Sequence, residues 1–526
     1  MDRWVDRVAL VTGASTGIGA SICKGLVRNG MKVVGCARNV DAIEKIAEEL
    51  SSFTHGELLP IKCDLTNELE ILHMFQEIKK HYGRIDVCIN NAGLSKNCPL
   101  MSGNTDHWRN LLDVNVLALC ICTREAIKLM KEKEIDDGQI IHISSVLGCK
   151  VITPFGSSFY CGTKHMVNAL AEGLRQELRE EKSKIRVCCI SPALVKTEFI
   201  SRMVESTEIA QEFYESRNSL QPENVAETVL NVLKMPKHVD INDIIIQTTL
   251  PSIIRVSVRF QGCSLPIHFR NGNMDRWMNR VALVTGASAG IGASICKELV
   301  KNGMKVVGCA RNVDAIKKIA EELASLSPGE LLPIKCDLNN DSEILGMFEE
   351  IRKRFGRIDV CINNAGLSFV CPLMNGSTEK WRELLQVNVL ALCICTREAI
   401  KLMREKGIED GQIIHISSMS AYRVTGLRGT NFYAGTKHMV RALAEGLRQE
   451  LRAEKSKIRV CCISPGMVET EFWGRMIENP ELGKEKYKGL RCLQADDIAK
   501  TVLHVLEMPE HVDINDILVR PTEQQS

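Results

Sequence analysis

The chain has 526 residues, more than one compact domain usually holds, since domains run to about 50–250 residues. Hydrophobic residues make up 45% of it and charged residues 25%, proportions that are typical of a globular protein and exclude a disordered or collagen-like bulk. With 67 basic and 65 acidic side chains the net charge is +2, so we expect no nucleic acid partner. No run of about 18 apolar residues is present, and we therefore expect no membrane span.

The 22 cysteines lie in apolar contexts rather than in metal-ligand spacing. Cys88 falls in IDVCIN, and Cys120 and Cys122 fall in LALCICT, where core side chains are expected. Such positions are typical of free buried thiols in a reducing compartment, and no metal site is predicted. Residues 1–7 are charged, whereas a secretory signal needs an apolar segment. We therefore expect a cytoplasmic protein.

An internal repeat divides the chain. The sequence that begins at Met1 returns at Met274. The same offset of 273 residues relates Gly13 to Gly286 and continues without a gap. At about 250 residues, each copy can bury a core of its own, so the repeat predicts the duplication of a whole domain rather than a solenoid.

The repeat predicts a first domain over 1–250, a linker over 251–273 and a second domain over 274–526. The linker contains arginines and apolar pieces but no acidic residue. Three interpretations of it stay open. It forms an ordered arm that packs on a domain, or an irregular tether, or it marks the join of two neighbouring genes, because Met274 opens a complete second copy.

Within each copy, short aliphatic runs alternate with longer segments of helical spacing such as Asp41–Leu50 and Trp108–Lys131. This alternation predicts an α/β domain with a mostly parallel sheet and helices on both faces. Pro60 cannot donate a ladder hydrogen bond, so we expect the third strand at a sheet edge. The predicted strands of the first copy are Val8–Val11, Lys32–Ala37, Leu58–Cys63, Ile85–Ile89, Gln139–Ile143 and Ile185–Ile190.

A glycine-rich turn follows the first predicted strand and opens a helix. It reads Thr-Gly-Ala-Ser-Thr-Gly-Ile-Gly over residues 12–19 and returns over 285–292. Such glycines let the backbone turn tightly and approach a pyrophosphate, which rests on the N–H groups at the helix start. The pattern predicts a dinucleotide site in each copy, and a glycine turn without a ligand is the alternative.

The end of the second predicted strand decides between NAD and NADP. An acidic residue there would bind the ribose hydroxyls and repel a 2′-phosphate. This chain has Arg38 instead, repeated as Arg311. A guanidinium donates two charge-assisted hydrogen bonds to a phosphate, so NADP is predicted; a solvated surface arginine is the alternative.

A tyrosine and a lysine are spaced four residues apart in both copies. Tyr160 and Lys164 would share one helix face, so that the ammonium approaches the phenol. A neighbouring positive charge lowers the pKa of a phenol, which an acid–base tyrosine needs near neutral pH. The hydroxyl of Ser145, after the fifth predicted strand, adds to this pattern.

Four motifs in this order resemble the short-chain dehydrogenase/reductase family. They are Thr-Gly-x-x-x-Gly-x-Gly, Asn-Asn-Ala-Gly at 90–93, the Ser-Ser pair at 144–145 and Tyr-x-x-x-Lys. The resemblance covers both copies but not the linker, and it implies two tandem Rossmann-type, doubly wound parallel-sheet domains. The pieces MDRW, VVGCAR, TKHMV and AEGLRQELR are similar to insect NADP-dependent farnesol dehydrogenases and to the vertebrate member-11 reductases.

The resemblance implies four catalytic residues in each copy. An asparagine would hold a proton-relay water, a serine would hold the substrate oxygen, and a tyrosine would be the acid–base. A lysine would lower the pKa of the tyrosine and bind the nicotinamide ribose. These residues are Asn115, Ser145, Tyr160 and Lys164 in the first copy and Asn388, Ser418, Tyr433 and Lys437 in the second.

The resemblance also implies a cofactor-binding set. In the first copy it comprises Gly13, Ser15, Gly17, Ile18, Gly19, Arg38, Asp64, Asn91, Ala92, Gly93, Pro192 and Thr197. In the second copy it comprises Gly286, Ser288, Gly290, Ile291, Gly292, Arg311, Asp337, Asn364, Ala365, Gly366, Pro465 and Thr470. Two positions depart from the family pattern. Ala193 stands where Pro-Gly is usual, and Ala421 stands where a glycine is usual, each an exchange between small residues.

These features predict an NADP-dependent oxidoreductase that transfers hydride between NADP(H) and a small alcohol or carbonyl compound, with an isoprenoid alcohol such as farnesol as substrate. A broad reductase for ketosteroids and other carbonyls is one alternative. A catalytically idle NADP-binding scaffold is another, from a different class. The family implies a homo-oligomer, or a pseudo-dimer formed within one chain.

Overall fold

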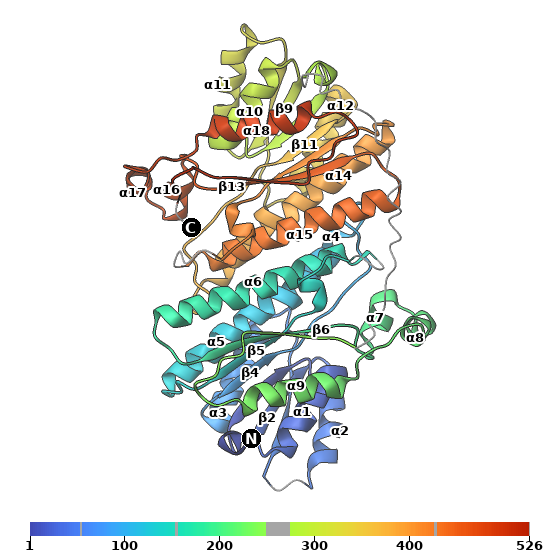
Figure 1. The fold of residues 1–526 in the computed structure, drawn as a ribbon, viewed down its shortest axis with the longest axis vertical. Coiled ribbons are helices and arrows are strands. Elements are labelled where there is room, and N and C mark those ends of the chain that lie inside the picture. The colour runs from blue at the N-terminus through green and yellow to red at the C-terminus, as the bar shows by residue number, and fades with distance from the viewer. Residues whose placement is uncertain (53–54, 153–155, 249–273, 425–428, 525–526) are drawn as a thin grey trace.

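The computed structural model describes residues 1–52, 55–152, 156–248, 274–424 and 429–524. Within these residues the chain forms two parallel sheets of seven strands each, with helices on both faces. Figure 1 shows one sheet in the blue-to-green half of the chain and the other in the yellow-to-red half. The predicted fold class, two tandem Rossmann-type domains, is confirmed. The linker over 251–273 lies outside the described residues.

The two sheets have the same strand order. The first is ordered β3-β2-β1-β4-β5-β6-β7 and the second β10-β9-β8-β11-β12-β13-β14. In both, the order reverses beside the first strand, which opens a crevice at the carboxyl ends of the strands where ligands bind in such folds. The strands of the first sheet are β1 (Val8–Thr12), β2 (Lys32–Ala37), β3 (Glu57–Lys62), β4 (Val87–Asn90), β5 (Gln139–Ile143), β6 (Arg186–Pro192) and β7 (Asp243–Ile246). Those of the second are β8 (Val281–Thr285), β9 (Lys305–Ala310), β10 (Glu330–Lys335), β11 (Val360–Asn363), β12 (Gln412–Ile416), β13 (Arg459–Pro465) and β14 (Asp516–Val519).

The six predicted strands are all present, and β3 lies at the sheet edge as Pro60 indicated. The seventh strand, β7, was not predicted. It is four residues long and its side chains alternate between exposed and half-buried, so it lacks the continuous apolar run of the inner strands. A short edge strand of this kind carries little signal in sequence.

Helices connect the strands. In the first half they are α1 (Gly17–Arg28), α2 (Val40–Leu50), α3 (Glu68–Tyr82), α4 (Thr105–Leu112), α5 (Ala118–Glu132), α6 (Ser158–Glu180), α7 (Phe199–Val204), α8 (Thr207–Glu215) and α9 (Pro222–Lys234). In the second they are α10 (Gly290–Lys301), α11 (Val313–Ala324), α12 (Asp341–Phe355), α13 (Thr378–Leu385), α14 (Leu392–Glu405), α15 (Asn431–Ala453), α16 (Phe472–Met476), α17 (Pro480–Glu485) and α18 (Ala495–Glu507). No helix within the described ranges combines the length and apolar composition that crossing a bilayer requires.

The predicted helical segment Trp108–Lys131 is interrupted. A π-helical stretch, Asp113–Leu117, separates α4 from α5, and its counterpart Gln386–Ala391 separates α13 from α14. Apolar spacing does not reveal this insertion, because every residue from 115 to 123 is buried and the run therefore has no helical period to interrupt. Asn115, one of the predicted site residues, lies within the first of these stretches.

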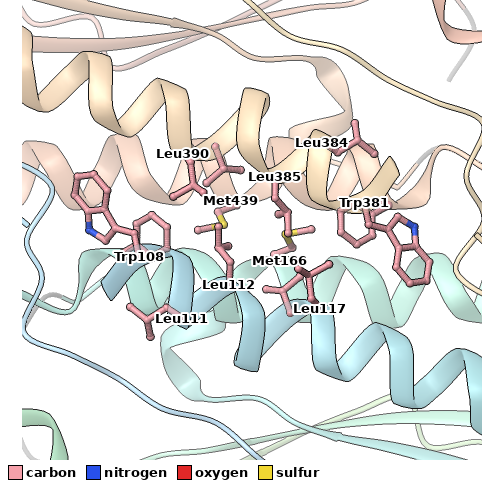
Figure 2. Close-up of a cluster of buried hydrophobic side chains, with 14 of the residues drawn as sticks. Trp108, Leu111, Leu112, Leu117, Met166, Trp381, Leu384, Leu385, Leu390 and Met439 are labelled. Carbon is pink, nitrogen blue, oxygen red and sulfur yellow. The ribbon is translucent and has the colours of Figure 1, made fainter. Parts of the chain in front are cut away.

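The two halves pack against each other along the long helices α6 and α15. Figure 2 shows the apolar cluster between them, to which both halves contribute the same kinds of side chain from equivalent helices. The cluster is continuous with the cores beneath it, so one body of buried side chains extends through both halves. Its labelled members are Trp108, Leu111, Leu112, Leu117, Met166, Trp381, Leu384, Leu385, Leu390 and Met439.

The thiols agree with the sequence prediction. In the described residues the cysteines are free, and all of them are buried except the exposed Cys149 and the half-buried Cys492. No three His, Cys, Asp or Glu side chains in the same ranges form a metal-binding cluster.

Candidate active site

The glycine turn lies between β1 and α1. Gly13 and Gly17 have φ of 67° and 56°, a left-handed backbone that side chains disfavour. A Cβ on Gly19 would lie 2.2 Å from the carbonyl oxygen of Gly13, so the first turn of α1 also requires glycine. The second half repeats this geometry between β8 and α10. The turn leaves a cradle at the helix start, which suits the backbone N–H groups to a phosphate.

The end of β4 supports this turn. The Thr12 hydroxyl accepts hydrogen bonds from the backbone N–H groups of Asn91 and Ala92, both at 3.0 Å. The Asn91 amide donates to the Thr12 carbonyl at 2.8 Å. The Asn91 side chain therefore holds the backbone of the glycine turn and shapes the cradle at the start of α1.

Two charged positions lie at the ends of the neighbouring strands. Arg38, after β2, is exposed, and its guanidinium has no ion pair with any described residue. Arg311, its counterpart after β9, is likewise exposed and unpaired within the described ranges. Asp64, after β3, accepts hydrogen bonds from the backbone N–H and the hydroxyl of Thr66 at 3.0 and 2.9 Å. Its carboxylate thus shapes the turn that leads to α3.

The serine and the tyrosine come from adjacent elements. Ser145 follows β5, and its hydroxyl accepts a hydrogen bond from the backbone N–H of Leu147 at 3.1 Å. Tyr160 lies in the first turn of α6 and is 7% exposed. Burial raises the pKa of the Tyr160 phenol, and a hydrogen bond with Ser145 acts in the opposite direction. In the second half burial raises the pKa of Tyr433 to about 12, and the hydrogen bond with Ser418 again acts in the opposite direction.

The lysine lies one helical turn beyond the tyrosine. Lys164 Nζ donates to the carbonyl oxygen of Ile143 at 3.0 Å and lies 5.7 Å from the centroid of the Tyr160 ring. Its ammonium therefore lies near the Tyr160 ring and is held by the end of β5. Burial lowers the pKa of Lys164 to about 8, and the pKa of Lys437 falls to about 8 for the same reason.

The π-helical stretch brings Asn115 to the same place. Its amide donates to the carbonyl of Leu94 at 2.9 Å and to the hydroxyl of Thr163 at 3.1 Å. A Cβ on Gly93 would lie 3.5 Å from both Asn115 Oδ1 and Lys164 Nζ. Asn115, Lys164 and Gly93 are therefore neighbours, although they lie far apart along the chain.

In the second half the counterparts of these residues surround a cavity of about 1420 Å³. Every residue predicted for this site lines it except Asn388, which supports it from behind. The remaining walls are largely apolar and include Phe472, Trp473 and Met476. The Phe472 ring lies 5.8 Å from the Tyr433 ring between centroids, and Phe199 lies 5.6 Å from Tyr160 in the first half.

One wall of this cavity was not predicted. Pro521, Glu523 and Gln524, near the end of the chain, line it. Gln524 Oε1 accepts a hydrogen bond from the backbone N–H of Met467 at 3.0 Å, and a Cβ on Gly466 would lie 2.3 Å from that oxygen. The glycine at 466 thus gives the segment room to dock. The difference between Pro465-Gly466 and Pro192-Ala193 was the available signal, since an alanine would obstruct it.

Known proteins of the same family match each half of the chain separately. The model of the short chain dehydrogenase family matches residues 7–208 and again residues 280–481. "Dehydrogenase/reductase SDR family member 11" of Gallus gallus is 54% identical over 255 residues, which are 48% of this chain and all of that protein. "Farnesol dehydrogenase" of Aedes aegypti is 36% identical over 253 residues, which are 48% of this chain and all of that protein. Similarity to both groups is therefore confirmed.

One solved structure aligns with both halves at once. The C-domain of a bacterial malonyl-CoA reductase, determined with NADP, covers 98% of this chain and 99% of its own, with a TM-score of 0.71. Its sequence is 15% identical, so the likeness concerns the fold alone. Two sheets of this kind thus occur side by side in another single chain.

Proposed function

Because the chain belongs to the short chain dehydrogenase family, whose members are oxidoreductases acting on CH–OH groups, we propose that each half is an NADP-dependent enzyme that interconverts an alcohol and a carbonyl compound. The observation that carries this proposal is the meeting of a serine, a tyrosine and a lysine at one crevice in both halves. Ser145, Tyr160 and Lys164 come together through contacts that Ser418, Tyr433 and Lys437 repeat.

The arginines favour NADP over NAD. Arg38 and Arg311 follow the second strand of each sheet, are exposed, and have no acidic partner among the described residues. A free guanidinium at this place suits a 2′-phosphate, whereas the acid that would select NAD is missing from both positions. The glycine cradle at the start of α1 fits the pyrophosphate, because a Cβ there would fill the space.

The chain's own residues handle the proton and the substrate oxygen. The bound cofactor would supply or accept hydride. Since burial keeps the Tyr433 phenol protonated at neutral pH, it can donate its proton to the oxygen of a carbonyl substrate as charge develops there. The Ser418 hydroxyl adds a second hydrogen bond to that oxygen. The reverse reaction needs the phenolate, so oxidation should gain with rising pH.

The apolar walls suit an isoprenoid alcohol such as farnesol. Phe472, Trp473 and Met476 face the second cavity, and an Aedes aegypti relative bears the name farnesol dehydrogenase. A broad reductase for steroids and other ketones is the second candidate, and the cavity volume of about 1420 Å³, which includes the cofactor crevice, favours it. An idle scaffold would not need the serine, tyrosine and lysine that both halves retain.

The domain boundaries form part of the proposal. We place one catalytic domain over 1–250 and the other over 274–526, joined by the linker 251–273 and paired within one chain in the cytoplasm. The packing of α6 on α15 supports this pairing.

Turnover assays test the proposal. The purified chain is offered farnesol, other prenols, retinoids and hydroxysteroids, and the matching carbonyls, with NADP(H) and with NAD(H). Turnover of a prenol with NADP is expected. Turnover of steroids alone would favour the broad reductase, and the absence of turnover while NADPH still binds would favour the scaffold.

A further inference from the structure

Two consecutive residues of α6 contact the opposite half of the chain. The amide of Gln176 donates to the carbonyl oxygen of Val424 at 3.2 Å. The carboxylate of Glu177 accepts hydrogen bonds from the backbone N–H groups of Leu373 and Met374 at 2.9 and 3.1 Å. Val424, Leu373 and Met374 belong to loops of the far side. Glu177 also accepts a hydrogen bond from the amide of Asn431, the first residue of α15, at 2.9 Å.

Helix α15 makes the same contacts in return. Gln449 donates to the carbonyl oxygen of Val151 at 2.9 Å. Glu450 accepts from the backbone N–H groups of Leu100 and Met101 at 2.9 and 3.1 Å. Each half thus holds two loops of the other by one amide and one carboxylate.

The first of these loops follows the catalytic serine. Val424 lies between Ser418 and Tyr433 in the sequence, and the cavity is lined by Met419 and Ser420 before it and by Thr430 after it. Fixing the carbonyl of Val424 therefore fixes a wall of the substrate site from outside.

The second loop forms the facing wall. Leu367, Ser368 and Phe369 line the cavity, and the Glu177 contacts lie a few residues farther along the same loop. The backbone N–H of Cys371 donates to the carbonyl of Gly429 at 2.7 Å, which joins the two loops. Gln176 and Glu177 thus hold a single connected wall.

These contacts are built into the protein interior. Glu177 and Glu450 are 3% and 8% exposed, a costly place for a carboxylate unless backbone donors satisfy it, as they do here. Each glutamine amide is also held by a glutamate one turn earlier, at 3.3 Å from Glu172 and 3.1 Å from Glu445. The side chains are therefore directed at the opposite half rather than free to rotate.

We infer that Gln176 and Gln449 are positioning residues for the substrate side of the opposite active site: Gln176 acts on the site of Tyr433, and Gln449 acts on the site of Tyr160. Each active site is then complete only when the other half is docked against it. This inference rests on the proposed function for its kinetic consequence, whereas the anchoring of the loops does not depend on it.

The kinetic test uses the full chain with one site silenced. In Tyr433→Phe, where the first site alone works, adding Gln449→Met should raise the substrate KM by about three- to tenfold, the effect of losing one hydrogen bond. Adding Gln176→Met to the same background is the matched control and should leave that KM unchanged. In Tyr160→Phe the two glutamine variants should exchange roles. The KM for NADPH should stay the same throughout.

Hydrogen exchange tests the anchoring without any turnover. Gln449→Met should speed exchange in residues 146–152, and Gln176→Met should speed it in 419–424. If a glutamine variant affects the site on its own helix, affects both sites equally, or alters neither loop, the inference is overturned. An inactive chain that still shows crosswise exchange would refute the proposed function and leave the positioning of the loops supported.

Discussion

The guanidinium of Arg397, in the second half, lies 5.3 Å from the centroid of the Trp108 ring in the first half. Arg124 and Trp381 form the reciprocal pair at 5.5 Å. Each arginine also donates to the first residue of a helix in the opposite half. Arg397 donates to the hydroxyl of Thr105 in α4, and Arg124 donates to that of Thr378 in α13, both at 2.9 Å. The two halves therefore meet through one surface used twice, as in a twofold dimer.

Separate expression of 1–250 and 274–526 should give two dimers rather than two monomers. Each half alone would expose the apolar cluster of Figure 2, and each carries the surface that complements it. Sedimentation velocity would measure the mass of each product. A soluble, active monomer would show that the cluster is not needed to hold a half together.

Two helical glycines should respond in opposite ways to alanine. A Cβ on Gly173 of α6 would lie 2.6 Å from Asn431 Cβ of α15, so Gly173→Ala should lower the free energy of unfolding by about 1–3 kcal/mol. Gly346 of α12 is exposed with open space around it, and Gly346→Ala should raise that energy by about 0.5–1 kcal/mol. Urea unfolding of the full chain measures both. Equal effects of the two changes would mean that contact across the halves contributes little.

Tyr160→Phe and Tyr433→Phe should each silence one site, and the double variant should lose all turnover. The expected loss at each site is about 10²–10⁴-fold, because the phenol transfers a proton while its ring only packs. Steady-state kinetics and NADPH titration, read together, check this, since cofactor binding should hardly change. A double variant that keeps more than a few per cent of the activity would remove tyrosine from the mechanism.

Arg38→Asp combined with Arg311→Asp should shift preference from NADP towards NAD. A carboxylate beside the 2′-phosphate should cost at least about tenfold, or about 1.4 kcal/mol. The ratio of kcat/KM for the two cofactors is the measurement. Arg354→Asp, an exposed arginine of α12 outside the cavity lining, serves as the control for added negative charge. A ratio that moves equally in the control would assign Arg38 and Arg311 to solvated surface.

Acid should destabilise the fold through two buried histidines. Burial lowers the pKa of His142 and His415 to about 3, and Asn90 donates to the His142 ring at 3.1 Å. The unfolded chain takes up protons below about pH 6.5 while the folded chain does not, so stability is lost as pH falls from 6.5 towards 3.

Between pH 7 and pH 5, each histidine should cost about 2 kcal/mol of unfolding free energy. Urea titrations of the wild type and of His142→Gln with His415→Gln at both pH values measure the difference. The variant should start less stable but show the smaller pH dependence. An equal dependence in the two proteins would assign the acid sensitivity to other groups.

Motifs with fixed backbone requirements were predictable from the sequence. The glycine turn, Ser145 and Tyr160 occupy the expected elements, since their local geometry depends on neighbours in the chain. The contact of Lys164 was less predictable, because its partner is the carbonyl of Ile143 at the end of β5, a different element from the helix that carries the lysine. The crosswise glutamines could not be predicted, since a glutamine on an exposed-looking helix face carries no signal of what packs against it.

In an assembly of two identical chains, every inherited change appears on both sides of the twofold axis. In this chain a change appears in one half only, and equivalent positions of the two halves already differ. Ile200 is equivalent to Trp473, and Lys96 is equivalent to Phe369. Selection can therefore alter one pocket while its twin preserves an earlier specificity. Keeping the duplicates in a single polypeptide also keeps the two products in equal amounts.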